Sequence, residues 1–245
     1  MGSHESAFAE WRKLREARGP EISIIDLYEL VSRPRGLEPH ELPAGERDQL
    51  ARRALPVLFP GHETLPDTNR PLDPVELVPY DADWPSRFRR WQGRLQEALD
   101  PAPLRIDHIG STAVPGMAAK PIIDIQVSVR DFRDEPSYAP AIESLGVQLR
   151  SRDHEHLFFR PFAGRPRDVQ IHVTTVGSTW ERRPLLFVSY LRANPEARER
   201  YAAAKQMAAS RWSDDRLAYM DAKRAVIDGI MSAAEAWAER TGWNV

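Results

Sequence analysis

The sequence predicts a mixed α/β (α+β) domain that is preceded by a helical N-terminal extension. The first observation is a short apolar segment that ends in a Gly-Ser turn and is followed by a β-branched run at residues 122–129. The second is a pair of alternating runs, at 157–162 and 169–176, which indicate two strands joined by a hairpin turn. The third is the helical spacing of apolar residues on either side of these strands. We therefore expect a sheet flanked by helices.

The N-terminal extension is expected to hold three short helices. Apolar residues recur at helical spacing over residues 6–18. A second helix begins at Ser23, which forms a capping pair with Asp26, and a third covers residues 44–55, where Pro56 is expected to end it. These helices look too small to build a core of their own. Packing on the main domain, a homodimer contact and a lid remain alternatives for them.

Proline placement divides the chain into three parts. Residues 1–59 form the helical extension, residues 60–74 contain four prolines and indicate a linker, and residues 75–240 form the main domain. The main domain is expected to open with a strand at 75–80 and an amphipathic helix after Asp83. Its last helix is expected to begin at 213, with these residues facing inward: Leu217, Met220, Ile227, Met231 and Ala234.

Composition limits the classes of function. The 245 residues, 42% of them hydrophobic, are sufficient for a core, and the formal charge of −2 provides no overall field that would recruit nucleic acid or a membrane surface. The absence of cysteine excludes disulfides and thiolate catalysis. No apolar run approaches the roughly 20 residues that span a bilayer, so a cytoplasmic protein is the default expectation.

The segment 106–129 organises the main domain. Gly110 allows another group to approach the backbone, while Ser111 and Thr112 offer hydroxyls beside amides that attract anions at the start of a helical turn. In the strand that follows, alternation places Asp124 on the face opposite the apolar residues. A carboxylate beside a phosphate-binding turn is a place for Mg²⁺. The alternative is an ordinary turn between two core strands with Asp124 as a plain polar residue.

A resemblance favours the functional interpretation. The string from Ile106 through Gly110-Ser111-Thr112 to Asp124-Ile125 closely resembles the signature of the GrpB-like family. That family is counted among the nucleotidyltransferase-fold proteins, and its members are sometimes fused to dephospho-coenzyme A kinase. The resemblance covers about residues 75–240. It implies a nucleotidyltransferase-like mixed sheet flanked by helices.

The resemblance also implies a function. It suggests an enzyme that transfers a nucleotidyl group from ATP or a similar triphosphate to a small-molecule acceptor with Mg²⁺ as cofactor. Asp124 and His172 are the catalytic candidates, since the pKa of a histidine lies near neutrality. Asp124 and Gln126 are the metal candidates. The residues expected to bind the nucleotide are Gly110, Ser111, Thr112, Lys120, Lys205 and Lys223.

The sequence departs from the superfamily pattern in its acids. The pattern usually supplies three carboxylates, but Gln126 stands at the second position and the strand at 169–176 carries Gln170 and His172 where an acid is expected. Two tightly held ions are therefore not expected. The alternative function is a nucleotide-binding or scaffolding protein with degraded catalysis. In either case Arg152, His154 and Arg160 are candidates for contacts with a substrate anion.

Overall fold

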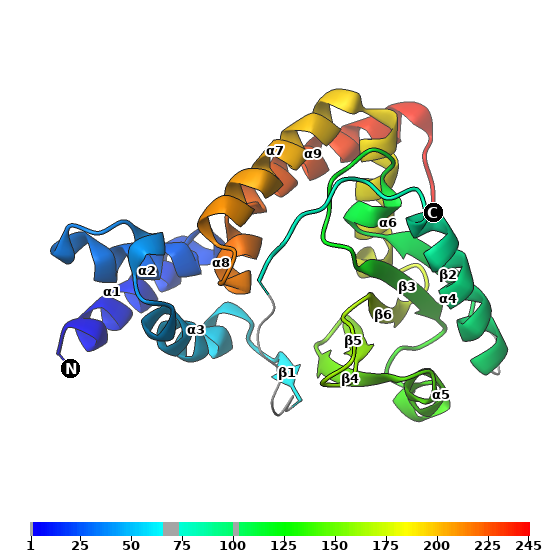
Figure 1. Cartoon of the computed structure of the whole chain (residues 1–245), viewed down its shortest axis with the longest axis horizontal. Helices are drawn as coiled ribbons and strands as arrows, with labels where there is room; N and C mark the ends of the chain where they lie inside the picture. Colours follow the sequence, from blue (N-terminus) through cyan, green and yellow to red (C-terminus); the bar gives the residue numbers. More distant parts are fainter. Residues whose placement is uncertain (1, 66–73, 100–102) are drawn as a thin grey trace. The chain divides into compact units, whose positions relative to one another are not determined.

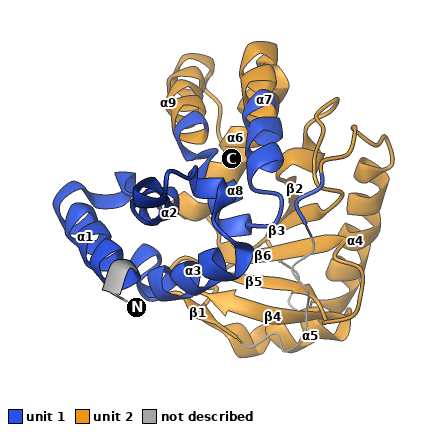
Figure 2. Cartoon of the chain, turned by 60° about the vertical axis from the view of Figure 1, so that its left-hand side comes forward, with its two compact units in different colours: residues 1–61, 72–76, 203–226 blue, residues 62–71, 77–202, 227–245 orange. Residues whose placement is uncertain are grey.

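The computed structural model describes residues 2–65, 74–99 and 103–245 (Figure 1). The chain divides into two compact units (Figure 2). Unit 1 comprises Met1–Gly61, Leu72–Glu76 and Ala203–Val226, and unit 2 comprises His62–Pro71, Leu77–Ala202 and Ile227–Val245. Residues 203–226, which the sequence assigned to the main domain, thus group with the N-terminal helices. Most of the predicted linker at 60–74 lies outside the described residues.

Unit 1 is helical. It contains α1 (Gly2–Arg18), α2 (Ile24–Ser32), α3 (Ala44–Leu58), α8 (Arg216–Asp221) and one end each of α7 (Pro195–Arg211) and α9 (Arg224–Thr241). Short 3-10 turns connect the first helices: Gly19–Glu21, Arg33–Arg35 and Pro39–Glu41. Trp11, Leu27 and Tyr28 are buried in a core that Trp212 and Tyr219 complete. The N-terminal helices therefore share a core with a segment from the C-terminal third of the chain.

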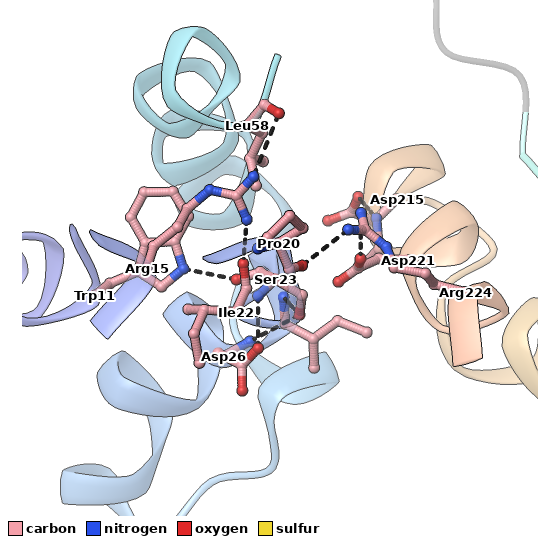
Figure 3. Close-up of polar contacts among 12 residues, drawn as sticks. Trp11, Arg15, Pro20, Ile22, Ser23, Asp26, Leu58, Asp215, Asp221 and Arg224 are labelled. Atoms are coloured by element: carbon pink, nitrogen blue, oxygen red, sulfur yellow. Dashed lines mark hydrogen bonds and ion pairs between the residues drawn. The ribbon is translucent and has the colours of Figure 1, made fainter. Parts of the chain in front are cut away.

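Polar contacts fix the connection between α1 and α2 (Figure 3). Ser23 and Asp26 form the predicted capping box, in which each side chain accepts from the other residue's backbone N–H. The Trp11 indole donates to the Ser23 carbonyl at 2.7 Å, and the Arg15 guanidinium donates to the Ile22 carbonyl. Arg224 donates to the Pro20 carbonyl at 3.0 Å. The connection is thereby tied to both α1 and the start of α9.

Unit 2 is built on a six-stranded mixed sheet with the order β1-β4-β5-β6-β3-β2. The pair β3–β6 is parallel and all other neighbours are antiparallel. This parallel pairing places the polar residues of β3 and β6 side by side. The strand bounds are β1 Glu63–Thr64, β2 Arg105–Ile109, β3 Ile123–Val129, β4 Val147–Arg152, β5 His156–Pro161 and β6 Val169–Thr175.

The two faces of the sheet differ in character. In register, Asp124 lies beside Gln170 and Gln126 beside His172, so these polar residues share one face. The opposite face carries Ile125, Val127, Ile171 and other residues of a fully buried core. Helices α4 (Trp84–Ala98) and α5 (Ala139–Ser144) contribute Trp84, Leu95 and Ile142 to this core and so cover the apolar face. Helix α6 (Thr179–Ala193) contacts the polar face.

Several predicted elements differ from the structure. Residues 75–80 form no strand, because Val78 makes only an isolated bridge with Ala119. Pro56 lies inside α3, which continues for two more residues to Leu58, so the proline removes one helical hydrogen bond close to the end of the helix but does not end it at 55. The predicted last helix is interrupted between α8 and α9, and Met220 is 57% exposed rather than inward. Strands β1 and β4 were not predicted. None of the described helices is both long and apolar enough for a membrane crossing.

Candidate functional site

The predicted turn and the predicted carboxylate lie in direct contact. Gly110 has φ 71° and ψ −173°, and the 3-10 turn η4 (Ser111–Ala113) follows it. Ile109, the last residue of β2, pairs with Asp124 near the start of β3. A Cβ atom on Gly110 would lie 2.3 Å from Oδ2 of Asp124. The backbone conformation and this close approach both require glycine, so the carboxylate is held against the turn.

Three side-chain contacts fix the turn itself. The Thr112 hydroxyl donates to the Ile122 carbonyl at 3.1 Å and lies 3.0 Å from Nε2 of His108. Since that hydroxyl already donates, the His108 ring donates to it from Nε2. Arg192 of α6 donates from Nε and Nη2 to the Ala113 carbonyl at 2.9 and 2.7 Å. Thr112 is thus a buried structural residue of the turn, while Ser111 is partly exposed.

Tyr201 is a site residue that sequence reasoning did not select. Its buried hydroxyl is hydrogen-bonded to the Ser111 side chain, and the negative charge of Asp124 acts on it. Burial and this charge raise the pKa of Tyr201 to about 12, against the opposing effect of the Ser111 hydrogen bond. The signal in the sequence was its position within residues 75–240, the part of the chain that resembles the GrpB-like family. Gly110, Ser111, Asp124 and Tyr201 form the cluster that we call the cradle.

Gln126, a predicted metal ligand, lies apart from the cradle. It is two residues beyond Asp124 on the same face of β3, but its side chain is fully buried. Its Nε2 donates to the Glu181 carbonyl of α6 at 3.2 Å. Helix α6 therefore covers this part of the sheet, whereas Asp124 stays partly exposed.

His172, the second catalytic candidate, lies in an aromatic cluster. Its ring centroid is 5.0 Å from Phe158, 5.3 Å from Trp180 and 5.5 Å from His156. Burial lowers the pKa of His172 to about 3, and the nearby His156 contributes in the same direction. His156 in turn lies 2.8 Å from Oδ2 of Asp153. The His172 ring is therefore neutral at pH 7 and packed among other rings.

The three candidates for anion contacts are separated in the structure. Arg152 of β4 already makes ion pairs with Glu63 and Glu135, at 2.8 and 2.9 Å. The side chain of His154 is 81% exposed in the connection between β4 and β5. Arg160 is on the polar face of β5, in register with Gln148. Of the three, Arg160 alone lies on a strand of the face that carries Asp124.

The predicted lysines divide between the units. Lys120 is partly buried in unit 2, just before β3. Lys205 and Lys223 belong to unit 1 and are 2% and 9% exposed. The ammonium of Lys223 lies 4.0 Å from the centroid of the Tyr219 ring. The cradle described here therefore consists of residues of unit 2 alone.

Comparison with known proteins identifies the family. Residues 74–233, the part that carries the cradle, match the family model described as GrpB protein. The chain belongs to the GrpB family. It is 38% identical over 162 residues to a UPF0157 protein of Halalkalibacterium halodurans, which covers 66% of this chain and 83% of the relative. The GrpB resemblance deduced from the 106–125 string is thereby confirmed.

Two further relatives of this GrpB protein are informative. A Mycolicibacterium paratuberculosis protein named dephospho-CoA kinase is 33% identical over 233 residues, covering 82% of this chain but 57% of the relative. The crystal structure of conserved protein GrpB from Enterococcus faecalis matches with a TM-score of 0.59 and 29% identity, covering 66% of this chain and 99% of that one. The mixed α+β fold with flanking helices is confirmed, while membership of the nucleotidyltransferase superfamily stays a prediction.

Proposed function

We propose that this GrpB protein binds ATP or a similar nucleoside triphosphate at the cradle and transfers a nucleotidyl group to a small-molecule acceptor. The observation that carries the proposal is the contact between Asp124 and Gly110. It brings a partly exposed carboxylate to the start of a helical turn, where backbone amides favour phosphate oxygens. Ser111 adds a partly exposed hydroxyl at the same place. Together these groups suit a phosphate that carries a divalent cation.

The donor set fits one Mg²⁺ ion. Asp124 would hold it, since Mg²⁺ is commonly bound by one or two carboxylates plus phosphate oxygens of the substrate. Within the described residues no group of three or more His, Cys, Asp or Glu side chains is placed to hold a metal. When bound, the ion would neutralise charge on the phosphates during transfer.

The residues of the cradle would position the phosphate and the attached cation. Gly110 leaves room for the Asp124 carboxylate beside the turn. Ser111 would donate its hydroxyl to a phosphate oxygen, while Tyr201 orients that hydroxyl. In this proposal His172 is not the base, because an imidazole with a pKa of about 3 holds a proton weakly at neutral pH. Its place among three rings gives it a packing role instead.

The second candidate function is nucleotide binding without transfer. The observation that favours it is the shortage of carboxylates: Asp124 is the single acid of β3, and Gln126, which carries no charge, is buried beneath α6. Single-metal transfer and simple binding predict different behaviour of the same variants. They can therefore be separated directly.

The experiment measures binding and turnover of wild type, Asp124→Asn and the control Asp131→Asn, an exposed aspartate in the loop after β3. We expect ATP with Mg²⁺ to raise the melting temperature of wild type and the control, with a smaller shift for Asp124→Asn and after chelation. Pyrophosphate release with a metabolite pool should appear in wild type and the control alone. Binding without release in any of the proteins would favour the second candidate. No shift at millimolar nucleotide would contradict both.

A further inference from the structure

A cavity of about 410 Å³ lies along β2, the edge strand of the sheet in unit 2. Its volume is within the range of small-molecule sites, roughly 300–1,000 Å³. Helix α4 contributes Phe88 and Gln92, and α6 contributes Val188, Ser189 and Arg192. Residues on both faces of β2 line it, so the cavity extends around the open edge of this strand. We infer that it binds a small organic anion in which a carboxylate or phosphate is attached to a flat ring.

The side chains that line the cavity carry one positive charge that no lining carboxylate side chain pairs with. Arg105 and Asp107 form a bidentate pair, at 3.0 and 3.1 Å, and so neutralise each other. Arg192 makes no ion pair with a carboxylate among the described residues, and its contacts with the Ala113 carbonyl use two of its five N–H groups. The remaining donors and an uncompensated charge are available to an anion.

Two further observations support an anion at Arg192. Partial burial of the guanidinium lowers its pKa, while the residue as a whole remains exposed, so an anion can reach the charge. The same charge acts on His108, whose pKa is lowered to about 4 by burial and by Arg192. His108 is therefore neutral at pH 7 and adds no second positive charge. The site thus suits a single negative group.

Aromatic side chains in the lining favour a ligand with a planar ring. The rings of Phe88 and His108 stack at 4.8 Å with an interplanar angle of 9°, and both line the cavity. Trp243 lines it as well. Aromatic walls favour a planar ligand. The amide of Gln92, which donates to the Ile106 carbonyl at 3.1 Å, satisfies a backbone group of the open edge and keeps it from pairing with another strand.

The test compares binding of phenyl phosphate, benzoate and the neutral benzamide by calorimetry. We expect saturable binding of the two anions at millimolar concentration and at least tenfold weaker binding of benzamide. Arg192→Gln should weaken the anions by about tenfold or more, since one charged hydrogen bond is worth about 1.5–3 kcal/mol. Arg183→Gln is the matched control, because Arg183 lies on the same helix and pairs with Asp228 at 3.2 Å. It should bind as wild type does.

A second variant is needed because Arg192 also donates to the Ala113 carbonyl, so Arg192→Gln could change the turn as well as the cavity. Ser189→Trp places a large side chain in the cavity and leaves Arg192 unchanged, so it should abolish binding of both anions. Equal affinity for anions and benzamide, or anion binding that survives both Arg192→Gln and Ser189→Trp, would overturn the inference, as would no saturable binding in wild type. The inference does not rest on nucleotidyl transfer. ATP binding to the cradle of Ser189→Trp is measured separately and is expected to match wild type.

Discussion

Asp124 and Gln126 are two residues apart on one face of one strand, yet their environments differ. Asp124 is partly exposed and lies against Gly110, whereas Gln126 is fully buried and donates to the Glu181 carbonyl. The difference comes from α6, which covers the second position and leaves the first open. A shared strand face therefore does not define a shared site. What lies over the face decides which of its polar residues can meet a ligand.

We expect the largest loss of stability from a substitution at Gly110, which lies against the partly exposed Asp124. Gly110→Ala adds a Cβ atom 2.3 Å from Oδ2 of Asp124 and places alanine in a conformation that is nearly restricted to glycine. We expect unfolding in urea to show a loss of about 3 kcal/mol or more, since such strain alone costs about 1–3 kcal/mol. The control is Gly116→Ala, where φ is 76° but no atom lies within 4 Å of the added Cβ. It should lose only about 1–2 kcal/mol. Equal losses would show that Asp124 is not held against the turn.

The second test places a carboxylate at position 126, which α6 covers. Gln126→Glu replaces the amide that donates to the Glu181 carbonyl with a group that repels it. We expect a loss of about 2 kcal/mol at pH 8, since an unsatisfied buried group costs about 1–3 kcal/mol. Burial should raise the pKa of the new carboxyl, so the loss should grow as pH rises above the ordinary glutamate value of about 4.3. Asp124→Asn is the comparison and should leave stability nearly unchanged. A stable Gln126→Glu protein would mean that α6 does not cover this residue.

Sequence reasoning could place polar residues on a face but could not find what covers them. Alternation correctly put Asp124 on the face opposite the apolar residues of its strand, and the parallel pairing of β3 with β6 places Gln126 and His172 on that face as well. Coverage depends on Glu181 of α6, more than 50 residues further along the chain, and no local pattern links it to Gln126. The core of unit 1 was missed for the same reason. Helical spacing shows that a face is apolar, but it does not name Trp212 as the partner.

The third test measures how the stability contributed by the buried His172 depends on pH. The pKa of His172 is lowered to about 3, so only the unfolded chain takes up this proton between pH 6.5 and 3. Stability should therefore fall as pH falls below 6.5, with at most about 1.4 kcal/mol lost by pH 5.5 from this group. His172→Gln should reduce the difference between urea unfolding at pH 7.5 and at pH 5.5. The exposed His154→Gln is the control. An unchanged difference in the His172 variant would indicate a ring that is open to water.

We expect the smallest loss of stability from removing the single hydrogen bond between Tyr201 and Ser111. Tyr201→Phe removes the hydroxyl that bonds to Ser111, which should cost about 1 kcal/mol in urea unfolding. Ser111→Ala should cost a similar amount, and the double variant should lose little more than either single one, because the two side chains form the same bond. Additive losses would mean that the hydroxyls are not partners. A hydrogen bond of this strength leaves the partly exposed Ser111 hydroxyl able to exchange partners with solvent. Gln126 is fully buried and donates to the Glu181 carbonyl, so its amide cannot exchange partners with solvent.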